Sequence, residues 1–188
     1  TMITGYFEQL YAHTRLYIVD ITAGIKPMIH GSQSRQLSMG GLLFSGNAHP
    51  IPRITIGIDD YIPFPGLFGY LEIKGGLSHG WLSEQDTYVT GSNIFVDKVK
   101  LHHKFIGLRV GGCLPVTLAY EMHHAAQWGG YKNPLLSGEP TIDYGNRWKD
   151  FWNVFFFQSG GISLSDQLNA QGNHIGFQEI TLAYHRNG

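Results

Sequence analysis

The residues best suited by type and spacing to recognise a ligand are basic and lie close together in the sequence. They are Lys98, Lys100, His102, Lys104 and Arg109, with Asp97 as their only near counter-charge. Strand residues two apart share a face, so the even-numbered members of this set would form a cationic ladder along one regular strand. A focused positive potential attracts polyanions, which favours an acidic ligand. A solvated polar face is the alternative interpretation of the same lysines.

Three aromatic residues, Trp81, Trp128 and Tyr131, lie near the predicted ends of strands. Their rings are candidates to stack on sugar rings, and with the basic residues they make up the predicted glycan-binding set. Tryptophan and tyrosine at strand ends also form the aromatic girdles of membrane β-barrels. A girdle is therefore the alternative interpretation of these three residues.

Adjacent histidines occur at His102-His103 and at His123-His124. Neighbours on a strand point to opposite faces, so neither pair can chelate a metal by itself. A metal site would require His102 or His103 to meet His123 across a hairpin, and polar filler is the favoured interpretation. We therefore predict no metal and no cofactor. Enzymatic activity is not predicted either, because the GNHIG string at 172–176 has His where a nucleophile elbow needs Ser.

The elements that would position these side chains are strands, and the clearest one covers 66–82. Its odd positions carry Leu71, Ile73, Leu77 and Trp81, and its even positions carry Glu72, Lys74 and Ser78. This period of two predicts one apolar and one polar face. At about 3.3 Å per residue the strand would reach about 50 Å, well beyond an ordinary globular strand. We expect the apolar face to meet lipid and the polar face to line a lumen.

Other segments alternate in the same way, and about eight strands are expected in one domain over residues 1–188. The regular ones are 15–26, 53–58, 114–128 and 176–186. The segment 95–110 changes phase, which predicts a bulge near 102–105. A short apolar strand is expected at 37–44, a constrained turn at 45–52, and loops at 59–65 and 83–93.

A different periodicity marks the only predicted helix, a short insertion near 146–157. Its aromatic residues recur at i, i+3, i+4, i+7 and i+8, the spacing of an amphipathic helix. They are Trp148, Phe151, Trp152, Phe155 and Phe156. A short strand with an apolar end is the alternative.

The composition agrees with a membrane wall made of strands. Charged residues are 14% of the chain, against about 25% in typical soluble domains. Aromatic residues are 13%, and 25 of the 188 residues are glycine. The longest apolar run is 154–157, far short of the roughly 20 residues of a membrane helix. The fold class predicted is all-β, an antiparallel transmembrane β-barrel present in part; a soluble β-sandwich or lipocalin-like barrel is the alternative.

Charge and cysteine content exclude some partners and some chemistry. The net charge is −1, so no general attraction to nucleic acid is expected. Cys113 is the single cysteine, which excludes an internal disulfide. Residues 1–10 lack the basic and apolar regions of a signal peptide, and 6–15 already alternates. We therefore expect the sequence to begin inside a longer protein.

Four strings resemble the capsule assembly Wzi family of outer-membrane proteins. They are LSMGGLLFSGNAHPIPRITIGI at 37–58, LEIKGGLSHGWL at 71–82, LRVGGCLPVTLAYEMHHAAQWGG at 108–130 and DQLNAQGNHIG at 166–176. They follow the family's order over most of the chain. The resemblance implies an internal fragment of a barrel of about eighteen strands, within the range of single-chain barrels.

The resemblance also implies a function. It places the protein in the outer membrane of a Gram-negative bacterium, in contact with outer-membrane lipid and monomeric when full length. There it would bind capsular polysaccharide, many forms of which are acidic, and anchor or assemble the capsule as a lectin. An outer-membrane porin or sugar channel without enzymatic activity is the alternative.

Overall fold

The computed structural model describes residues 7–31, 33, 41–44, 49–82, 96–132, 140–161 and 163–185. The strands are β1 (Leu10–Leu16), β2 (Val19–Ile25), β3 (Pro52–Pro63), β4 (Leu71–Trp81), β5 (Val96–Asp97), β6 (Lys100–Val110), β7 (Val116–Trp128), β8 (Tyr131–Lys132), β9 (Ile142–Asp143) and β10 (Asn173–Tyr184). The helices are α1 (Trp148–Phe155) and α2 (Leu164–Leu168). The protein is therefore mostly β, as the sequence predicts.

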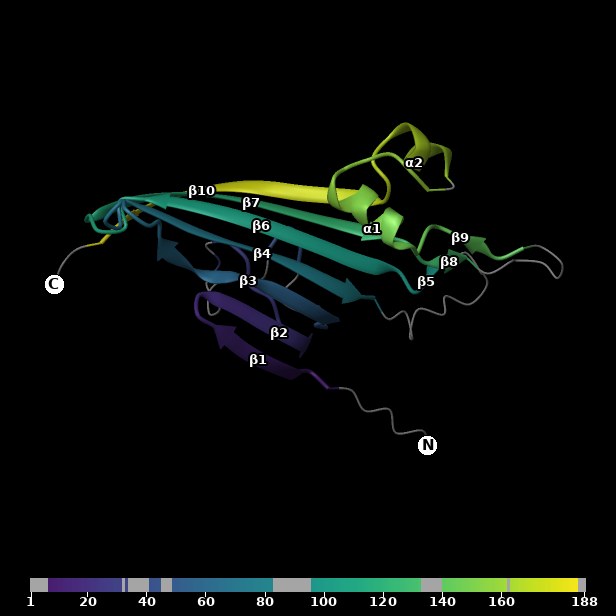
Figure 1. Ribbon diagram of the computed structural model, residues 1–188, viewed down its shortest axis with the longest axis horizontal. Helices are drawn as coiled ribbons and strands as arrows, with labels where there is room; N and C mark the ends of the chain where they lie inside the picture. Colours follow the sequence, from purple (N-terminus) through teal and green to yellow (C-terminus); the bar gives the residue numbers. More distant parts are fainter. Residues whose placement is uncertain are drawn as a thin grey trace. The chain divides into compact units, whose positions relative to one another are not determined.

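Seven strands form one sheet in the order β1-β2-β3-β4-β6-β7-β10 (Figure 1). The order follows the chain, and β1 pairs antiparallel with β2 and β2 with β3. Short turns at 17–18, 64–70 and 111–115 join successive strands, as expected for a meander. Among the described strands, β1 and β10 end this order, so the sheet is an open one.

Contacts within the chain define two compact units. Unit 1 comprises 1–78, 103–124 and 176–188, and unit 2 comprises 79–102 and 125–175. Unit 1 holds β1, β2, β3 and most of β4, β6, β7 and β10. Unit 2 holds α1, α2 and a second sheet in the order β5-β8-β9.

In unit 1 the sheet has the reverse of the usual soluble pattern, because polar side chains are buried and apolar ones are exposed. The buried polar residues of unit 1 are Asp20, Thr22, Arg53, Glu72, Ser78, His103, Thr117, Glu121, His123 and His124. The exposed apolar residues of β3, β6, β7 and β10 are Ile54, Ile56, Ile106, Leu108, Val110, Val116, Leu118, Met122, Ile180 and Leu182. The two sets alternate along β3 and β7, as expected for strands with one apolar and one polar face.

The longest predicted strand is shorter than expected. Strand β4 begins at Leu71, and residues 66–70 form the turn from β3. Gly66 and Gly69 have positive φ angles of 83° and 80°, and the backbone N–H of Tyr70 donates to the carbonyl of Leu67 at 2.8 Å. The apolar–polar alternation of the sequence therefore extends through residues 66–70, although these residues form a turn. The extended part spans about 36 Å at 3.3 Å per residue.

Two neighbouring predictions were also wrong. The loop expected at 59–65 is strand up to Pro63, because β3 runs from Pro52 to Pro63. The strand expected at 37–44 is not strand at 41–44, where the N–H of Gly41 donates to the carbonyl of Phe44 at 2.8 Å and closes a turn. Residues 37–40, part of the turn at 45–52 and the loop at 83–93 lie outside the described residues.

The predicted strand 95–110 is divided at Lys98 and Val99. Lys98 has a positive φ of 58°, so it leaves the strand geometry between β5 and β6. Strand β6 then runs unbroken from Lys100 to Val110. The phase change is seen at His102 and His103, which are consecutive and both buried.

Helix α1 confirms the predicted insertion, and its buried side includes two polar residues. Asp150, Asn153 and Val154 are buried, whereas Trp148 and Trp152 are 79% and 47% exposed. The small core of unit 2 consists of Ala126, Trp128 and Val154 with Phe151 packed against them. Neither α1 nor α2, the helices of the described residues, has the length and apolar content needed to cross a membrane.

Candidate binding pocket

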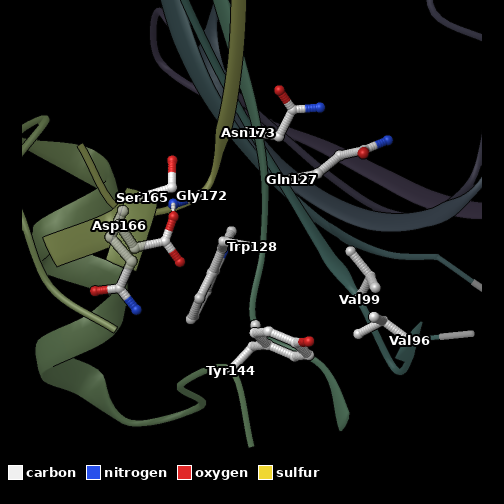
Figure 2. A pocket seen from close by; sticks show the side chains of 11 residues that line it. Val96, Val99, Gln127, Trp128, Tyr144, Ser165, Asp166, Gly172 and Asn173 are labelled. Atoms are coloured by element: carbon white, nitrogen blue, oxygen red, sulfur yellow. Dashed lines mark hydrogen bonds between the residues drawn. The ribbon is translucent and has the colours of Figure 1, made fainter. Parts of the chain in front are cut away.

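Unit 2 contains an open pocket with a volume of about 520 Å³ (Figure 2). We call it the unit 2 pocket. Its lining residues are Val96, Val99, Gln127, Trp128, Gly129, Tyr144, Ser165, Asp166, Gln171, Gly172 and Asn173. Aromatic rings, amides and one carboxylate therefore share one concave surface, and a few polar groups on an apolar floor are typical of small-ligand sites.

The pocket forms where several chain segments end. Gln127 and Trp128 are the last residues of β7, and Asn173 is the first residue of β10. Gly129 and Gly172 have positive φ angles of 69° and 99°, which lets the chain turn sharply on both sides of the pocket. The indole of Trp128 is 5% exposed, and its Nε1 donor has no hydrogen-bond partner among the described residues.

A buried polar network holds the wall that contains Gln171. The amide of Gln171 donates to Asp150 Oδ1 at 3.3 Å, and Asn153 Nδ2 donates to Gln171 Oε1 at 3.0 Å. Asp150 also accepts the backbone N–H of Arg147 at 2.9 Å, which caps the start of α1. One carboxylate therefore joins the helix to the pocket wall.

Replacing Asp150 with Ala should loosen this wall. We expect a loss of about 1–3 kcal/mol in unfolding free energy, because the buried Gln171 amide and the first turn of α1 both lose their acceptor. Urea unfolding followed by tryptophan fluorescence measures the change. An Asp150→Asn variant keeps an acceptor oxygen and should lose less; equal loss in both variants would contradict the role of the hydrogen bonds.

The structure brings four of the sequence-predicted residues together in pairs in unit 2. Lys100 Nζ lies 4.5 Å from the ring centre of Trp128, and Lys98 Nζ lies 5.9 Å from that of Tyr131. Lys100 Nζ also donates to Asn146 Oδ1 at 2.5 Å. Both contacts are cation–π pairs, and the one with Trp128 lies beside the pocket, because Trp128 lines it.

Trp81 also lies in unit 2, at the end of β4. Its ring is 43% exposed and makes an edge contact with His79 at 5.3 Å between ring centres. It is not among the residues that line the unit 2 pocket.

The continuous cationic ladder is not formed. Lys98 lies outside the strand, and His102 is fully buried against Phe151 and Phe155, at 5.6 and 5.3 Å between ring centres. Lys104 and Arg109 belong to unit 1. Arg109 is neutralised there, because its Nε lies 2.5 Å from Glu72 Oε2.

Sequence reasoning missed the pocket residues Tyr144, Asp166, Gln171 and Asn173. Three of them lie in the polar run DQLNAQGN at 166–173, which was noted for its family resemblance alone. The signal that could have found them is this concentration of amide and carboxylate side chains directly before a strand. Sequence reasoning missed helix α2 as well. The start of α2 is capped by Ser163 Oγ, which accepts the N–H of Asp166 at 3.0 Å.

Comparison with family models, with curated proteins and with solved structures finds no match for this chain. The structure therefore defines only a broad fold class, a mostly antiparallel all-β protein. The resemblance to the capsule assembly Wzi family stays a prediction from the four sequence strings.

Proposed function

We propose that this chain is part of an outer-membrane β-barrel that binds capsular polysaccharide at the bacterial cell surface. The observation that carries the proposal is the inverted sheet of unit 1, with polar side chains buried and apolar ones exposed. Contiguous apolar patches on soluble monomers rarely exceed a few hundred Å², so a sheet that exposes an apolar face favours a lipid environment. In an outer membrane, lipid covers that face, and the polar face lines the lumen.

The exposed aromatic residues of α1 and of its C-cap agree with a membrane location. Trp148, Trp152 and Phe156 are 79%, 47% and 58% exposed, although they are among the most apolar side chains of the chain. Tryptophan and phenylalanine side chains of this kind are stable at the boundary between lipid and water. Helix α1 would therefore lie at that boundary.

The unit 2 pocket is the proposed place of glycan contact. Tyr144 offers a ring surface, and Gln127, Asp166 and Asn173 offer hydrogen-bonding groups for sugar hydroxyls (Figure 2). Lys98 and Lys100 lie against aromatic rings next to these residues. A polysaccharide with acidic groups suits this combination, because the lysines supply charge and the rings supply stacking area. No step of this function requires an enzyme.

The test is binding of isolated capsular polysaccharide to the purified full-length protein in detergent. A Lys98→Gln/Lys100→Gln variant should bind about tenfold more weakly, which corresponds to about 1.4 kcal/mol. Tyr144→Ala should weaken binding by a similar factor. Lys149→Glu is the matched control, because Lys149 is an exposed lysine of α1 that does not line the pocket.

The outcomes separate the candidate functions. Equal binding by the wild type and the pocket variants would remove the pocket from the proposal, and no binding at any ionic strength would overturn it. Ion conductance in planar bilayers without polysaccharide binding would instead support the porin or sugar channel. Weaker binding at high salt is expected, since exposed charges are screened.

A further inference from the structure

We propose that His30, His103 and His123 form a binding site for a divalent transition-metal ion, with Zn²⁺ the ion that best fits the donors. Each residue offers one ring nitrogen, and these three nitrogens lie within 4.8 Å of one another. All three residues belong to unit 1. The site is separate from the glycan pocket and does not depend on the proposed function.

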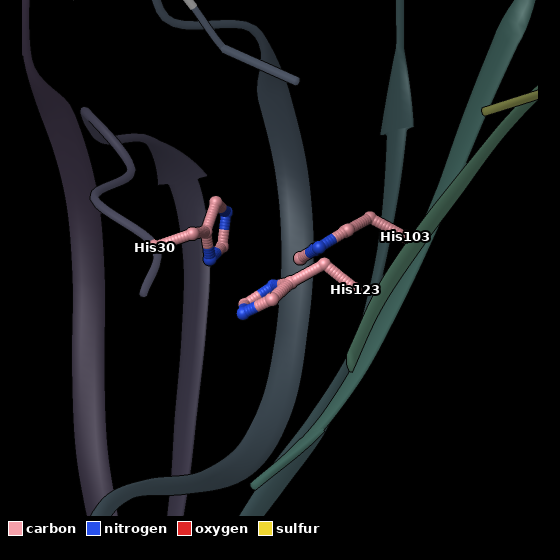
Figure 3. Close-up of side chains that lie close together, drawn as sticks. All are labelled: His30, His103 and His123. Carbon is pink, nitrogen blue, oxygen red and sulfur yellow. The ribbon is translucent and has the colours of Figure 1, made fainter. Parts of the chain in front are cut away.

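Three different elements bring these histidines together. His103 lies on β6 and His123 on the neighbouring β7, and His30 comes from the segment that follows β2 (Figure 3). The ring centre of His30 is 4.3 Å from that of His103 and 5.2 Å from that of His123. The figure shows the ring of His30 opposite the other two. The sheet therefore supplies His103 and His123, and the connection between β2 and β3 supplies His30.

Glu121 fixes the tautomer that a metal needs at His123. Its Oε2 lies 3.2 Å from His123 Nε2, so the imidazole donates from Nε2 and leaves a lone pair on Nδ1. Nδ1 of His123 is buried and has no hydrogen-bond partner among the described residues. A carboxylate that orients a histidine through its other nitrogen is a common second partner in metal sites.

His30 offers a second buried ring nitrogen to the cluster. Nε2 of His30 is buried and lacks a hydrogen-bond partner among the described residues. Two buried imidazole nitrogens without partners thus lie in one cluster, and a shared ion would satisfy both.

Packing alone accounts for only part of this arrangement. His123 stacks on Phe105 and Phe177, at 5.5 and 4.6 Å between ring centres, as an aromatic residue would. A phenylalanine at 30 or 123 would make such contacts without burying polar nitrogens. The convergence of three nitrogens is the feature that stacking does not require.

The donor set selects the ion. Neutral imidazoles suit Zn²⁺, Cu²⁺ and Ni²⁺ and do not suit Ca²⁺ or Mg²⁺, which prefer oxygen. Zinc binds histidine nitrogen at about 2.0–2.1 Å, so tetrahedral ligand atoms are about 3.4 Å apart. Small rotations of the side chains would close the present spacing to that value. Three histidines leave one coordination position for water or another ligand.

The experiment is metal titration of the full-length protein in detergent, after removal of bound metal with EDTA. Calorimetry with ZnCl₂ should give one equivalent per chain, and CoCl₂ should give the visible absorption of tetrahedral Co²⁺. His30→Ala and His103→Gln should each weaken zinc binding at least about 100-fold. Glu121→Gln should weaken it about 10- to 100-fold, as expected for a residue that orients a ligand.

His185→Ala is the matched control, because His185 is an exposed histidine outside the cluster. It should leave affinity and stoichiometry unchanged. His30 lies outside every strand, so His30→Ala should retain the β-sheet circular dichroism of the wild type. Absence of zinc, cobalt, nickel and copper binding would overturn the proposal. Zinc binding that survives both His30→Ala and His103→Gln would overturn it as well.

Discussion

An arginine in place of Met122 should prevent stable assembly of the protein in membranes. Met122 lies in the middle of β7, is 43% exposed and belongs to the apolar face of unit 1. If that face meets lipid, the guanidinium must be placed in hydrocarbon, at a cost of about 2–4 kcal/mol near the bilayer centre. Leu182→Arg should cost less, because Leu182 lies near the end of β10 and the cost falls toward the bilayer surface.

The measurement is folding of the full-length protein into lipid vesicles, followed by resistance of the folded form to urea. Leu114→Arg is the matched control. Leu114 is 48% exposed but lies in the turn between β6 and β7, where arginine would cost about 0–1 kcal/mol. Equal tolerance of arginine at 114 and 122 would contradict a lipid-facing sheet. A soluble β-protein would give that result, because exposed arginine is well solvated in water.

Alternation along the chain predicted the sheet well, since a period of two depends only on the strand itself. Ile54 and Ile56 on β3 and Leu118 and Met122 on β7 lie on the exposed face, as their spacing predicts. Alternation cannot show where a strand ends. Residues 66–70 continue the pattern, yet two glycines with positive φ turn the chain there.

Contacts between distant segments were the part that the sequence could not provide. His103 and His123 were recognised as residues that a metal site would need to bring together, and β6 and β7 are indeed neighbours. His30 was missed, because nothing local indicates that the connection after β2 folds back onto these strands. Tyr144 was missed for the same reason, since its place in the pocket depends on segments far away in sequence.

Helix α1 was predicted as an element, but the sequence did not show what each of its sides contacts. The aromatic spacing at 148–156 identified the helix. The structure buries Val154 in the core of unit 2 and also buries Asp150 and Asn153. Gln171 supplies hydrogen bonds for these two polar side chains. Periodicity shows which residues share a side of an element, whereas the tertiary structure decides whether that side contacts protein or solvent.

Removal of the Glu121 carboxylate should be among the most destabilising single changes in unit 1. Glu121 Oε1 lies 2.6 Å from Lys74 Nζ and accepts the hydroxyl of Tyr61 at 2.9 Å. The Lys74 side chain is only 14% exposed, so Glu121→Ala leaves an ammonium group with little solvent and no carboxylate at that position. Breaking a buried pair from one side costs about 3–5 kcal/mol, and urea unfolding in detergent should show a loss of this size.

A double variant distinguishes the ion pair from simple loss of packing. Lys74→Met/Glu121→Leu removes both charges and retains similar side-chain volume, so it should recover most of the stability that Glu121→Ala loses. The losses of the single variants Lys74→Met and Glu121→Leu, added together, should exceed the loss of the double variant by at least about 1 kcal/mol. Such a difference is expected for residues in direct contact. Additive losses would show that Lys74 and Glu121 act independently. Glu121→Gln should fall between the wild type and Glu121→Ala, because its amide oxygen still accepts from Tyr61 and Lys74 but carries no charge.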